Sequence, residues 1–408
     1  MVKPELLAPA GNLEKLKFAI IYGADAVYIG GKEFSLRAGA GNFSLDEIEE
    51  GVEFAHARGK KVYVAINIFP HNEDLKRLPK FIHSVWKTGI DAVILSDPGI
   101  LTMVKEIAPS LKIHLSTQAN PTNWASCNFW ASQGVDRIVL ARELSLEEIK
   151  EIREKTPPSL ELEIFVHGAM CISYSGRCLI SNYMTYRDAN RGECAHPCRY
   201  RYYLVEEKRP GQYFPVFEDE RGTYFFNSRD LCMLDKIPEL ARLKLTSYKI
   251  EGRMKSIHYV AQVTKLYRNA IDEYYKNPET YTFKDEWMRE LLKTTHREFT
   301  HGFYFGRPTG VDQNYEQGAY VKEYDFIGIV RHYDEDGKVA TVEQRNPVKT
   351  GEIVEFLSPD QPSFTQKIEE MRDEEGKEIE KAPHPRQIFK IKVERPVTTY
   401  TILRKPGE

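Results

Sequence analysis

The sequence lacks any apolar run of membrane-spanning length, and its first residues carry no apolar core of the kind found in secretory signals. We therefore expect a cytoplasmic protein that does not cross a membrane, and structural disulfides are rare in that compartment. The chain also lacks an excess of positive charge, because its formal net charge at pH 7 is −3. Affinity for nucleic acid cannot come from bulk charge, so a basic binding site must be local.

Two motifs of common hydrolases are missing as well. No His-Glu-x-x-His is present, which excludes the usual zinc-peptidase helix, and no Gly-x-Ser-x-Gly elbow is present. Cys171 and His167 are a candidate nucleophile and base. A nucleophilic site, however, needs one activated thiol rather than several together, and a histidine at the end of a strand is as readily a structural hydrogen-bonding residue.

Cysteine is scarce, yet five of the six cysteines lie within one stretch of 62 residues. Thiolates gathered in this way repel one another when ionised and oxidise when exposed. A soft metal centre removes both problems, so these cysteines are the first candidates for the chemistry of the chain. They are Cys171, Cys178, Cys194, Cys198 and Cys232, and Cys127 lies elsewhere.

Three interpretations of this cysteine stretch compete. Disulfides are disfavoured by the expected compartment. Structural zinc usually shows tight Cys-x2-Cys pairs, whereas the gaps here are Cys-x6-Cys, then Cys-x3-Cys, then a long interval before Cys232. An iron–sulfur cluster accepts irregular spacing, because its ligands come from several loops. The spacing favours the cluster over a zinc ribbon but leaves zinc open.

Short apolar runs alternate with helical patterns along the first 255 residues. We expect strands at 5–9, 26–30, 61–67, 92–96, 112–116, 137–141, 161–167 and 247–252. The expected helices lie at 12–22, 44–58, 73–88, 98–108, 120–133 and 145–155, with Asn12 and Ser44 as N-caps. Eight strands that alternate with helices predict a (β/α)8 TIM-like barrel. A doubly wound open sheet is the alternative.

Polar residues follow the expected strands, at the end of a barrel where active sites are built. The segment 168–246 is longer than a barrel connection needs, so we expect an insert that folds over this face and brings the remaining cysteines to it. The polar residues are Asn67, Ser96, Asp97, Ser116, Thr117, Gln118, Arg142, Glu143, His167, Glu251 and Arg253.

A change in the sequence pattern, from alternating strands and helices to short strands alone, predicts a second domain. The pattern is helical at 256–276, and from Gly318 onward short strands are expected at 327–331, 339–343, 352–356 and 388–393. The predicted domains are a catalytic barrel at 1–255 with its insert at 168–246, a helical linker at 256–316, and a small all-β barrel at 317–408. The charged run at 369–381 is expected to be a solvated helix or loop.

The insert is locally basic and rich in tyrosine. Between Cys171 and Tyr203 five arginines outnumber two acidic residues, and six tyrosines lie between them. Arginine for phosphates and tyrosine for stacking unpaired bases is a composition typical of proteins that bind single-stranded RNA loops. Alternatively, the arginines neutralise a metal cluster and the tyrosines pack beneath the insert.

Several motifs together resemble the peptidase U32 (collagenase-like) family. The longest is Glu163-x-Phe-x-His-Gly-Ala-Met-Cys-Ile-Ser-Tyr-Ser-Gly-x-Cys-x-Ile-Ser181, and others lie at 7–12, 24–31, 190–199, 228–232 and 249–253. The resemblance covers most of the chain. Better-understood members resemble oxygen-independent hydroxylases with a [4Fe–4S] cluster that act in ubiquinone synthesis, on ribosomal RNA or on the wobble uridine of tRNA.

The resemblance implies a function and a cluster. The trailing β-barrel, similar to domain 2 of elongation factor Tu, fits the subgroup that forms 5-hydroxyuridine at the tRNA wobble position, and the nucleic-acid members depend on prephenate. The implied ligands of the [4Fe–4S] cluster are Cys171, Cys178, Cys194 and Cys232. Cys198 is a fifth thiol that could replace Cys194.

This resemblance assigns expected roles to the polar residues. Prephenate carries two carboxylates, for which the candidate binding residues are Arg142, Arg229 and Arg253. The candidates for proton transfer are His167 and Glu251. The candidates for gripping a tRNA anticodon loop are Tyr186, Arg187 and Arg191. The alternative functions are a U32-type peptidase and a non-catalytic iron–sulfur partner protein.

Overall fold

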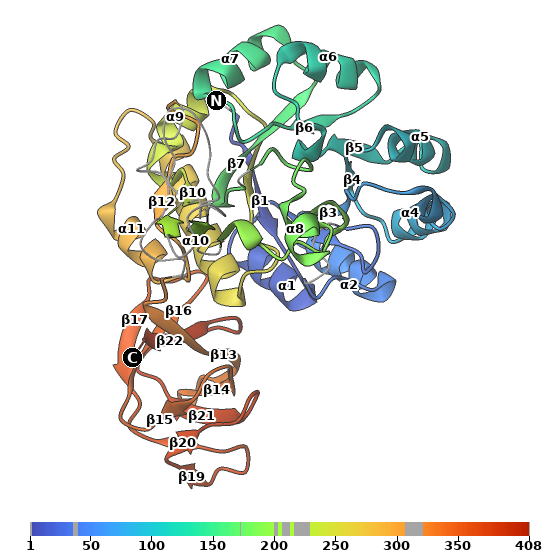
Figure 1. Cartoon of the computed structure of the whole chain (residues 1–408). Helices are drawn as coiled ribbons and strands as arrows, with labels where there is room; N and C mark the ends of the chain where they lie inside the picture. Colours follow the sequence, from blue (N-terminus) through green and yellow to red (C-terminus); the bar gives the residue numbers. More distant parts are fainter. Residues whose placement is uncertain are drawn as a thin grey trace.

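The computed structural model describes residues 2–35, 40–171, 173–199, 203–205, 213–215, 229–306 and 321–407. Eight parallel strands form a closed barrel, because the last strand pairs with both the first and the seventh. The predicted barrel is therefore confirmed, and the open sheet is excluded (Figure 1). The barrel strands are β1 (Glu5–Pro9), β2 (Ala26–Gly30), β3 (Lys61–Ile66), β4 (Ala92–Leu95), β5 (Lys112–Leu115), β6 (Arg137–Val139), β7 (Glu161–Ala169) and β11 (Ser247–Ile250).

Helices surround the barrel, and their starts follow the expected caps. The Asn12 side chain accepts a hydrogen bond from the backbone of Lys15, and Ser44 forms a capping box with Glu47. The helix expected at 73–88 is instead two helices, because Pro79 lacks the N–H that would continue the first one. The outer helices are α1 (Leu13–Ile21), α2 (Leu45–His56), α3 (Asn72–Leu75), α4 (Leu78–Lys87), α5 (Pro98–Ile107), α6 (Trp124–Ser132) and α7 (Leu146–Lys155).

Two further strands extend the barrel sheet, one from the long insert and one from a later segment. Strand β10 (Asp230–Cys232) pairs antiparallel with β7, and β12 (Phe299–Thr300) pairs parallel with β10. Between β7 and β10 lie α8 (Ile180–Thr185), the short 3-10 helices η2 (Ala189–Arg191) and η3 (Pro197–Arg199), and the hairpin of β8 (Tyr203–Val205) with β9 (Tyr213–Pro215). The 3-10 helix η4 (Leu234–Lys236) and α9 (Ile237–Arg242) lead back to β11.

Helix α10 (Ile257–Lys276) is the element on which both halves of the molecule pack. Its start at the N-cap Ser256 agrees with the helix expected at 256–276. It packs against α1, β1 and α11 (Asp285–Leu292), and most of its residues are buried. Within the ranges given above, no helix is long and apolar enough to cross a bilayer.

Eight strands of the C-terminal domain form an antiparallel sheet with a core of its own, and two further short strands pair with each other. The four expected strands are present, but the sequence pattern missed β22 near the middle of the sheet, because Arg404 and Lys405 interrupt its apolar run. The charged run at 369–381 is not a helix but a mainly irregular segment that contains two-residue strands. The strands are β13 (Tyr324–Asp334), β14 (Val339–Gln344), β15 (Val348–Lys349), β16 (Ile353–Leu357), β17 (Phe364–Lys367), β18 (Met371–Arg372), β19 (Glu378–Ile379), β20 (Lys381–Ala382), β21 (Ile388–Lys392) and β22 (Ile402–Pro406).

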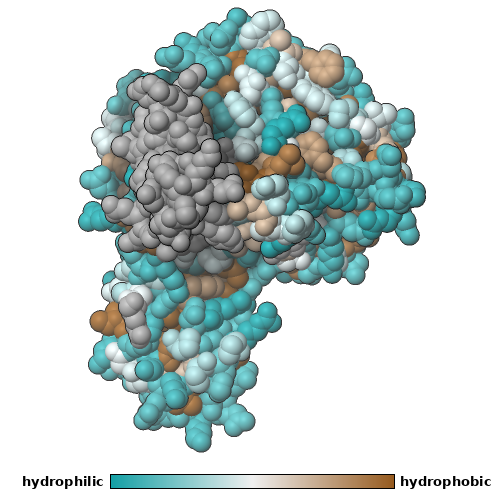
Figure 2. Space-filling model, in the orientation of Figure 1, coloured by the Kyte–Doolittle hydropathy of each residue, from teal (hydrophilic) through white to brown (hydrophobic). Residues whose placement is uncertain are grey.

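A specific interface fixes this domain against the barrel. Phe18 and Tyr22 of α1 join a buried apolar cluster with Ile329 and Ile402 of the C-terminal sheet. The fully buried Arg404 of β22 forms ion pairs with Glu290 of α11 and with Glu355 of β16. Breaking such a buried pair costs about 3–5 kcal/mol, so the two domains are held in one orientation. Figure 2 shows the outer surface of the C-terminal domain that faces the viewer, and most of it has hydrophilic colours.

Candidate functional site

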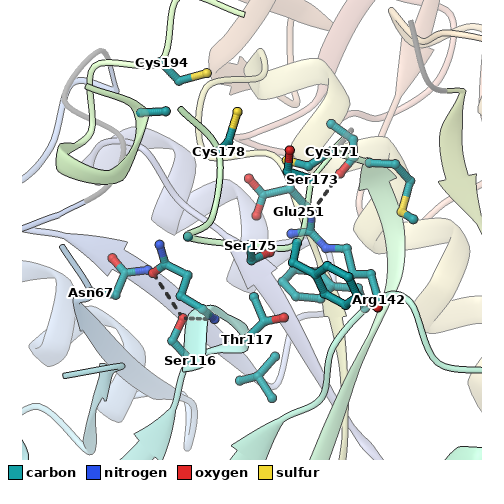
Figure 3. Close-up of a pocket in the computed structure, with 18 of the residues that line it drawn as sticks. Asn67, Ser116, Thr117, Arg142, Cys171, Ser173, Ser175, Cys178, Cys194 and Glu251 are labelled. Atoms are coloured by element: carbon teal, nitrogen blue, oxygen red, sulfur yellow. Dashed lines mark hydrogen bonds between the residues drawn. The ribbon is translucent and has the colours of Figure 1, made fainter. Parts of the chain in front are cut away.

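A cavity of about 150 Å³ lies at the carboxyl ends of the barrel strands. Most of the polar residues that the sequence placed at these ends line it, which brings together side chains from β3, β5, β6 and β11 (Figure 3). The strand-end residues that line the cavity are Asn67, Ser116, Thr117, Gln118, Arg142, Glu251 and Arg253. Ser96, Asp97, Glu143 and His167 do not line it; Asp97 instead caps α5.

Four cysteines line the same cavity: Cys171, Cys178, Cys194 and Cys198. The loop after β7 carries the first, and the insert carries the others. In Figure 3 the labelled cysteines lie above the polar residues from β3, β5 and β6.

Contacts with the β3–α3 loop hold the insert in this position. The backbone N–H of Phe69 donates to the Asn190 carbonyl at 3.1 Å, and the Asn190 side chain donates to the Cys178 carbonyl at 3.1 Å. The Arg191 guanidinium donates to both carboxylate oxygens of the buried Asp74, at 2.8 and 3.2 Å. Arg191, expected to contact RNA, therefore anchors the insert to α3, and its side chain is 34% exposed.

The donor set of the cavity fits an iron–sulfur cluster. All six cysteines lie in the described part of the chain, and none forms a disulfide. Within those ranges, no three His, Cys, Asp or Glu side chains lie close enough to hold a single metal ion. One zinc ion needs all of its ligands on one atom, whereas a [4Fe–4S] cluster takes each thiolate at a different iron. Four thiols that line one cavity could hold such a cluster, each at a different iron.

Cys232 is not among the thiols that line the cavity. It ends β10 opposite His167 of β7, is only 2% exposed, and does not line the cavity. Its Sγ lies 3.9 Å from the hydroxyl of Tyr267, and burial raises the pKa of the Cys232 thiol to about 12. The structure thus gathers Cys198 at the cavity, where the resemblance implied Cys232.

His167, expected to transfer protons, faces away from the cavity. Strict alternation along β7 would point residues 163, 165 and 167 inward, but a β-bulge against β11 shifts the register before His167. Its ring packs instead against Tyr259 and Tyr267 of α10 and against Phe299. Burial, with Lys255 and His296 nearby, lowers the pKa of His167 to about 3. In this position His167 is a neutral packing residue.

Glu251 is the carboxylate that lines the cavity. It follows β11 directly, and its Oε2 accepts a hydrogen bond of 2.9 Å from the hydroxyl of Tyr28 on β2. Tyr28 also lines the cavity, and this bond joins β2 to the residue after β11, the two strands that flank β1 in the barrel. The bond gives the carboxylate a defined direction within the site.

Three buried cations line the cavity: Arg142, Lys249 and Arg253. Arg142 lies over the Phe165 ring at 3.9 Å and donates to the Ala169 carbonyl at 3.1 Å, while its Nε has no partner. Among the described residues it has no carboxylate partner, so an anion can bind it. Lys249 was not among the expected site residues, although a period of two along β11 and the residue after it places 249 and 251 on one face.

Arg229, another candidate for binding a carboxylate, lies outside the cavity lining. Its guanidinium pairs with Glu298 at 2.8 Å. The other two expected arginines, Arg142 and Arg253, do line the cavity, so the structure brings two of the three together.

The rim of the insert exposes aromatic side chains. Tyr183 is 85% exposed and Tyr186 is 93% exposed, at the C-terminal end of α8. Tyr186 adopts the left-handed conformation with φ of +57°, which ends the helix there. Arg177 and Arg187 are exposed on the same insert and form no ion pair within the described ranges. Apolar rings next to unpaired cations make a surface suited to unpaired nucleotides.

The chain belongs to peptidase family U32. The model of peptidase family U32 matches residues 11–314, and the model of its C-terminal domain matches residues 322–404. Among its relatives, "tRNA hydroxylation protein P1" of Bacillus subtilis is 45% identical over 403 residues, with 99% of this chain and 95% of the relative covered. "tRNA hydroxylation protein P" of Escherichia coli is 39% identical, with 94% and 92% covered.

A third relative acts on a different RNA. The "23S rRNA 5-hydroxycytidine C2501 synthase" of Escherichia coli is 38% identical over 268 residues. The match covers 66% of this chain but only 39% of that protein.

Proposed function

We propose that this chain hydroxylates C5 of the wobble uridine of tRNA, with prephenate as co-substrate and a [4Fe–4S] cluster in the cavity. The observation that carries the proposal is a single cavity lined by four cysteines, three buried cations and one oriented carboxylate. The names of the two relatives that align over nearly the whole chain support tRNA as the substrate, and the third relative supports hydroxylation of a pyrimidine.

Cys171, Cys178 and Cys194 are the proposed ligands common to the cavity and to the family resemblance. The fourth thiolate comes from Cys198, which lines the cavity, or from Cys232, which the resemblance implies. A bound cluster would supply an iron centre for Lewis-acid or redox chemistry at the mouth of the barrel.

Arg142 and Arg253 are the proposed binding residues for the carboxylates of prephenate. A guanidinium holds a carboxylate through two parallel hydrogen bonds, and Arg142 has donors left for this. Both side chains are buried, so water competes little for them. Their burial makes the charge-assisted bonds stronger than they would be at the surface.

Glu251 is the proposed residue for proton transfer. Hydroxylation of C5 removes a proton and two electrons from that carbon, so the co-substrate would have to supply the oxygen and take up the electrons. A carboxylate in the cavity can accept the proton. The hydrogen bond from Tyr28 fixes the direction of the Glu251 carboxylate. His167 is dropped from this role because its ring faces α10.

The peptidase alternative loses its proposed catalytic pair. It required His167 to activate Cys171, but Cys171 lines the cavity while His167 is buried on the opposite face of β7. A base must lie within hydrogen-bond reach of the proton it removes. This geometry therefore favours the hydroxylase over a cysteine peptidase built on these two residues.

Deleting the gene, together with any redundant oxygen-dependent pathway, should remove 5-hydroxyuridine-derived nucleosides from tRNA. Loss of prephenate supply should give the same result, because the co-substrate is then absent. Mass spectrometry of digested tRNA measures both, and complementation with the wild-type chain is the control. Unchanged tRNA nucleosides in the deletion strain would contradict the proposal.

Replacing the exposed rim residues should weaken tRNA binding while leaving iron content unchanged. Arg187→Ala should act through lost phosphate contacts, so its effect should shrink as salt rises. Tyr186→Ala should cost about 1–3 kcal/mol of binding with little change in salt slope, because stacking is not ionic. Affinity of the anaerobic protein for tRNA is the measurement, and Arg386→Ala, an exposed arginine of the C-terminal domain, is the control. Loss of iron with normal tRNA binding would instead assign the arginine to charge neutralisation.

A further inference from the structure

A row of buried charges runs through the barrel interior and ends at the cavity. Arg137 of β6 lies 3.1 Å from Glu163 of β7, and Glu163 lies 3.0 Å from the ammonium of Lys249 on β11. These three side chains are at most 5% exposed. Charges so deeply buried persist only when they are paired, so each member of the row holds the next in place.

The far end of the row is anchored away from the cavity. Arg137 also pairs with Glu5 and Glu161. One carboxylate oxygen of Glu163 faces Arg137, and the other accepts a hydrogen bond from Lys249. Burial raises the pKa of the Glu163 carboxyl, but Lys249 and Arg137 outweigh this effect and hold it below its usual range. Glu163 is thus ionised, and its carboxylate accepts a hydrogen bond from Lys249 that directs this side chain along the row.

Lys249 keeps hydrogen-bonding capacity for a ligand. An ammonium has three N–H donors, and Glu163 accepts one of them. The remaining contacts of Lys249 with the described residues are to ring faces, 4.5 Å from the centre of Tyr28 and 5.5 Å from the centre of Phe165. Lys249 lines the cavity, so its two remaining donors are available there.

Cations and rings alternate along this wall of the cavity. Arg142 lies over Phe165, Lys249 lies near both Phe165 and Tyr28, and Arg253 lies 5.9 Å from the Tyr28 ring. All five side chains line the cavity. An anion that carries two carboxylates on an unsaturated ring complements this wall, because its carboxylates can meet cations while its ring packs on rings.

We propose that Lys249 joins Arg142 and Arg253 in binding the two carboxylates of the co-substrate, and that Glu163 is the positioning residue for the Lys249 ammonium. The inference rests on the proposed function, since it concerns the co-substrate of that reaction. It makes Lys249 the central cation of the site and gives the buried row of charges a role in binding rather than in stability alone.

The test is the affinity of the anaerobically reconstituted protein for prephenate, measured by calorimetry and as KM in tRNA hydroxylation. Lys249→Met should weaken binding and raise KM by about tenfold to a hundredfold, because a charge-assisted hydrogen bond is lost. That single change leaves the buried Glu163 carboxylate without its Lys249 partner, which could prevent folding. The double variant Lys249→Met with Glu163→Gln removes both charges and should fold. Glu163→Gln alone should give a smaller rise in KM, because Lys249 remains but is less well held.

Matched measurements separate this inference from the proposed function. Lys80→Met, an exposed lysine on α4, is the control and should bind prephenate as the wild type does. Iron content and tRNA affinity should be unchanged in the folded double variant. Wild-type affinity for prephenate in that variant would contradict the proposed role of Lys249 without contradicting the proposed hydroxylase function. A wild-type protein that binds prephenate but hydroxylates no tRNA would instead overturn the proposed function alone.

Discussion

Cys171→Ala, Cys178→Ala and Cys194→Ala are each expected to abolish both bound iron and tRNA hydroxylation. Each change removes one thiolate from a site that needs four, and a cluster with three thiolates and an exposed iron is readily lost during purification. Iron and sulfide analysis of anaerobically purified protein, together with its optical spectrum, is the measurement. Wild-type protein should be brown and contain iron and sulfide in equal amounts.

The same measurement identifies the fourth ligand. The cavity lining predicts that Cys198→Ala loses iron, whereas the family resemblance predicts the loss for Cys232→Ala. Cys127→Ala is the control, because Cys127 is buried in α6 and does not line the cavity. Wild-type protein that takes up stoichiometric zinc and refuses iron under anaerobic reconstitution would contradict the cluster.

Glu251→Gln is expected to lower kcat for hydroxylation by about 100- to 10,000-fold, the usual contribution of a positioned proton-transfer group. The amide keeps the shape of the side chain and can still bond Tyr28, but it cannot accept a proton from the substrate. Single-turnover hydroxylation of tRNA by the reconstituted variant is the measurement. Iron content and affinity for tRNA should stay at wild-type values.

A neighbouring carboxylate offers a matched control for this variant. Glu143 follows the end of β6 but does not line the cavity, so Glu143→Gln should keep kcat within about twofold, as substitutions away from a site usually do. If Glu251→Gln retained wild-type kcat, Glu251 would not be the proton acceptor. A rise in KM for prephenate alone would assign it to binding instead.

The barrel could be predicted because local rules determine its parts. Buried strands are short apolar runs. Asn12 and Ser44 cap the starts of their helices through hydrogen bonds to backbone N–H groups three residues later, which depends only on the local sequence. Once eight strands alternate with helices, the residues after each strand must share one end of the barrel. For that reason Asn67, Gln118 and Arg142 could be placed at one site from the sequence alone.

The residues whose position or role differed from the expectation depend on contacts between segments far apart in the chain, which no local sequence pattern predicts. A β-bulge turns His167 away from the cavity, and the alternation of β7 by itself points it inward. Arg191 is held by Asp74, which lies 117 residues earlier in the chain. Strand β22 is a strand because its neighbours on both sides pair with it, despite the charges of Arg404 and Lys405.

The amino-acid sequence by itself thus determined the barrel, the face that carries the site, and the thiols available to it. Only the tertiary structure decided which thiols and cations line the cavity. Cys198 and Lys249 line it and Cys232 and Arg229 do not, although all four lie near strand ends or in the insert. The physical reason is that burial and charge pairing act between strands far apart in the chain, as Glu163 does when it holds Lys249.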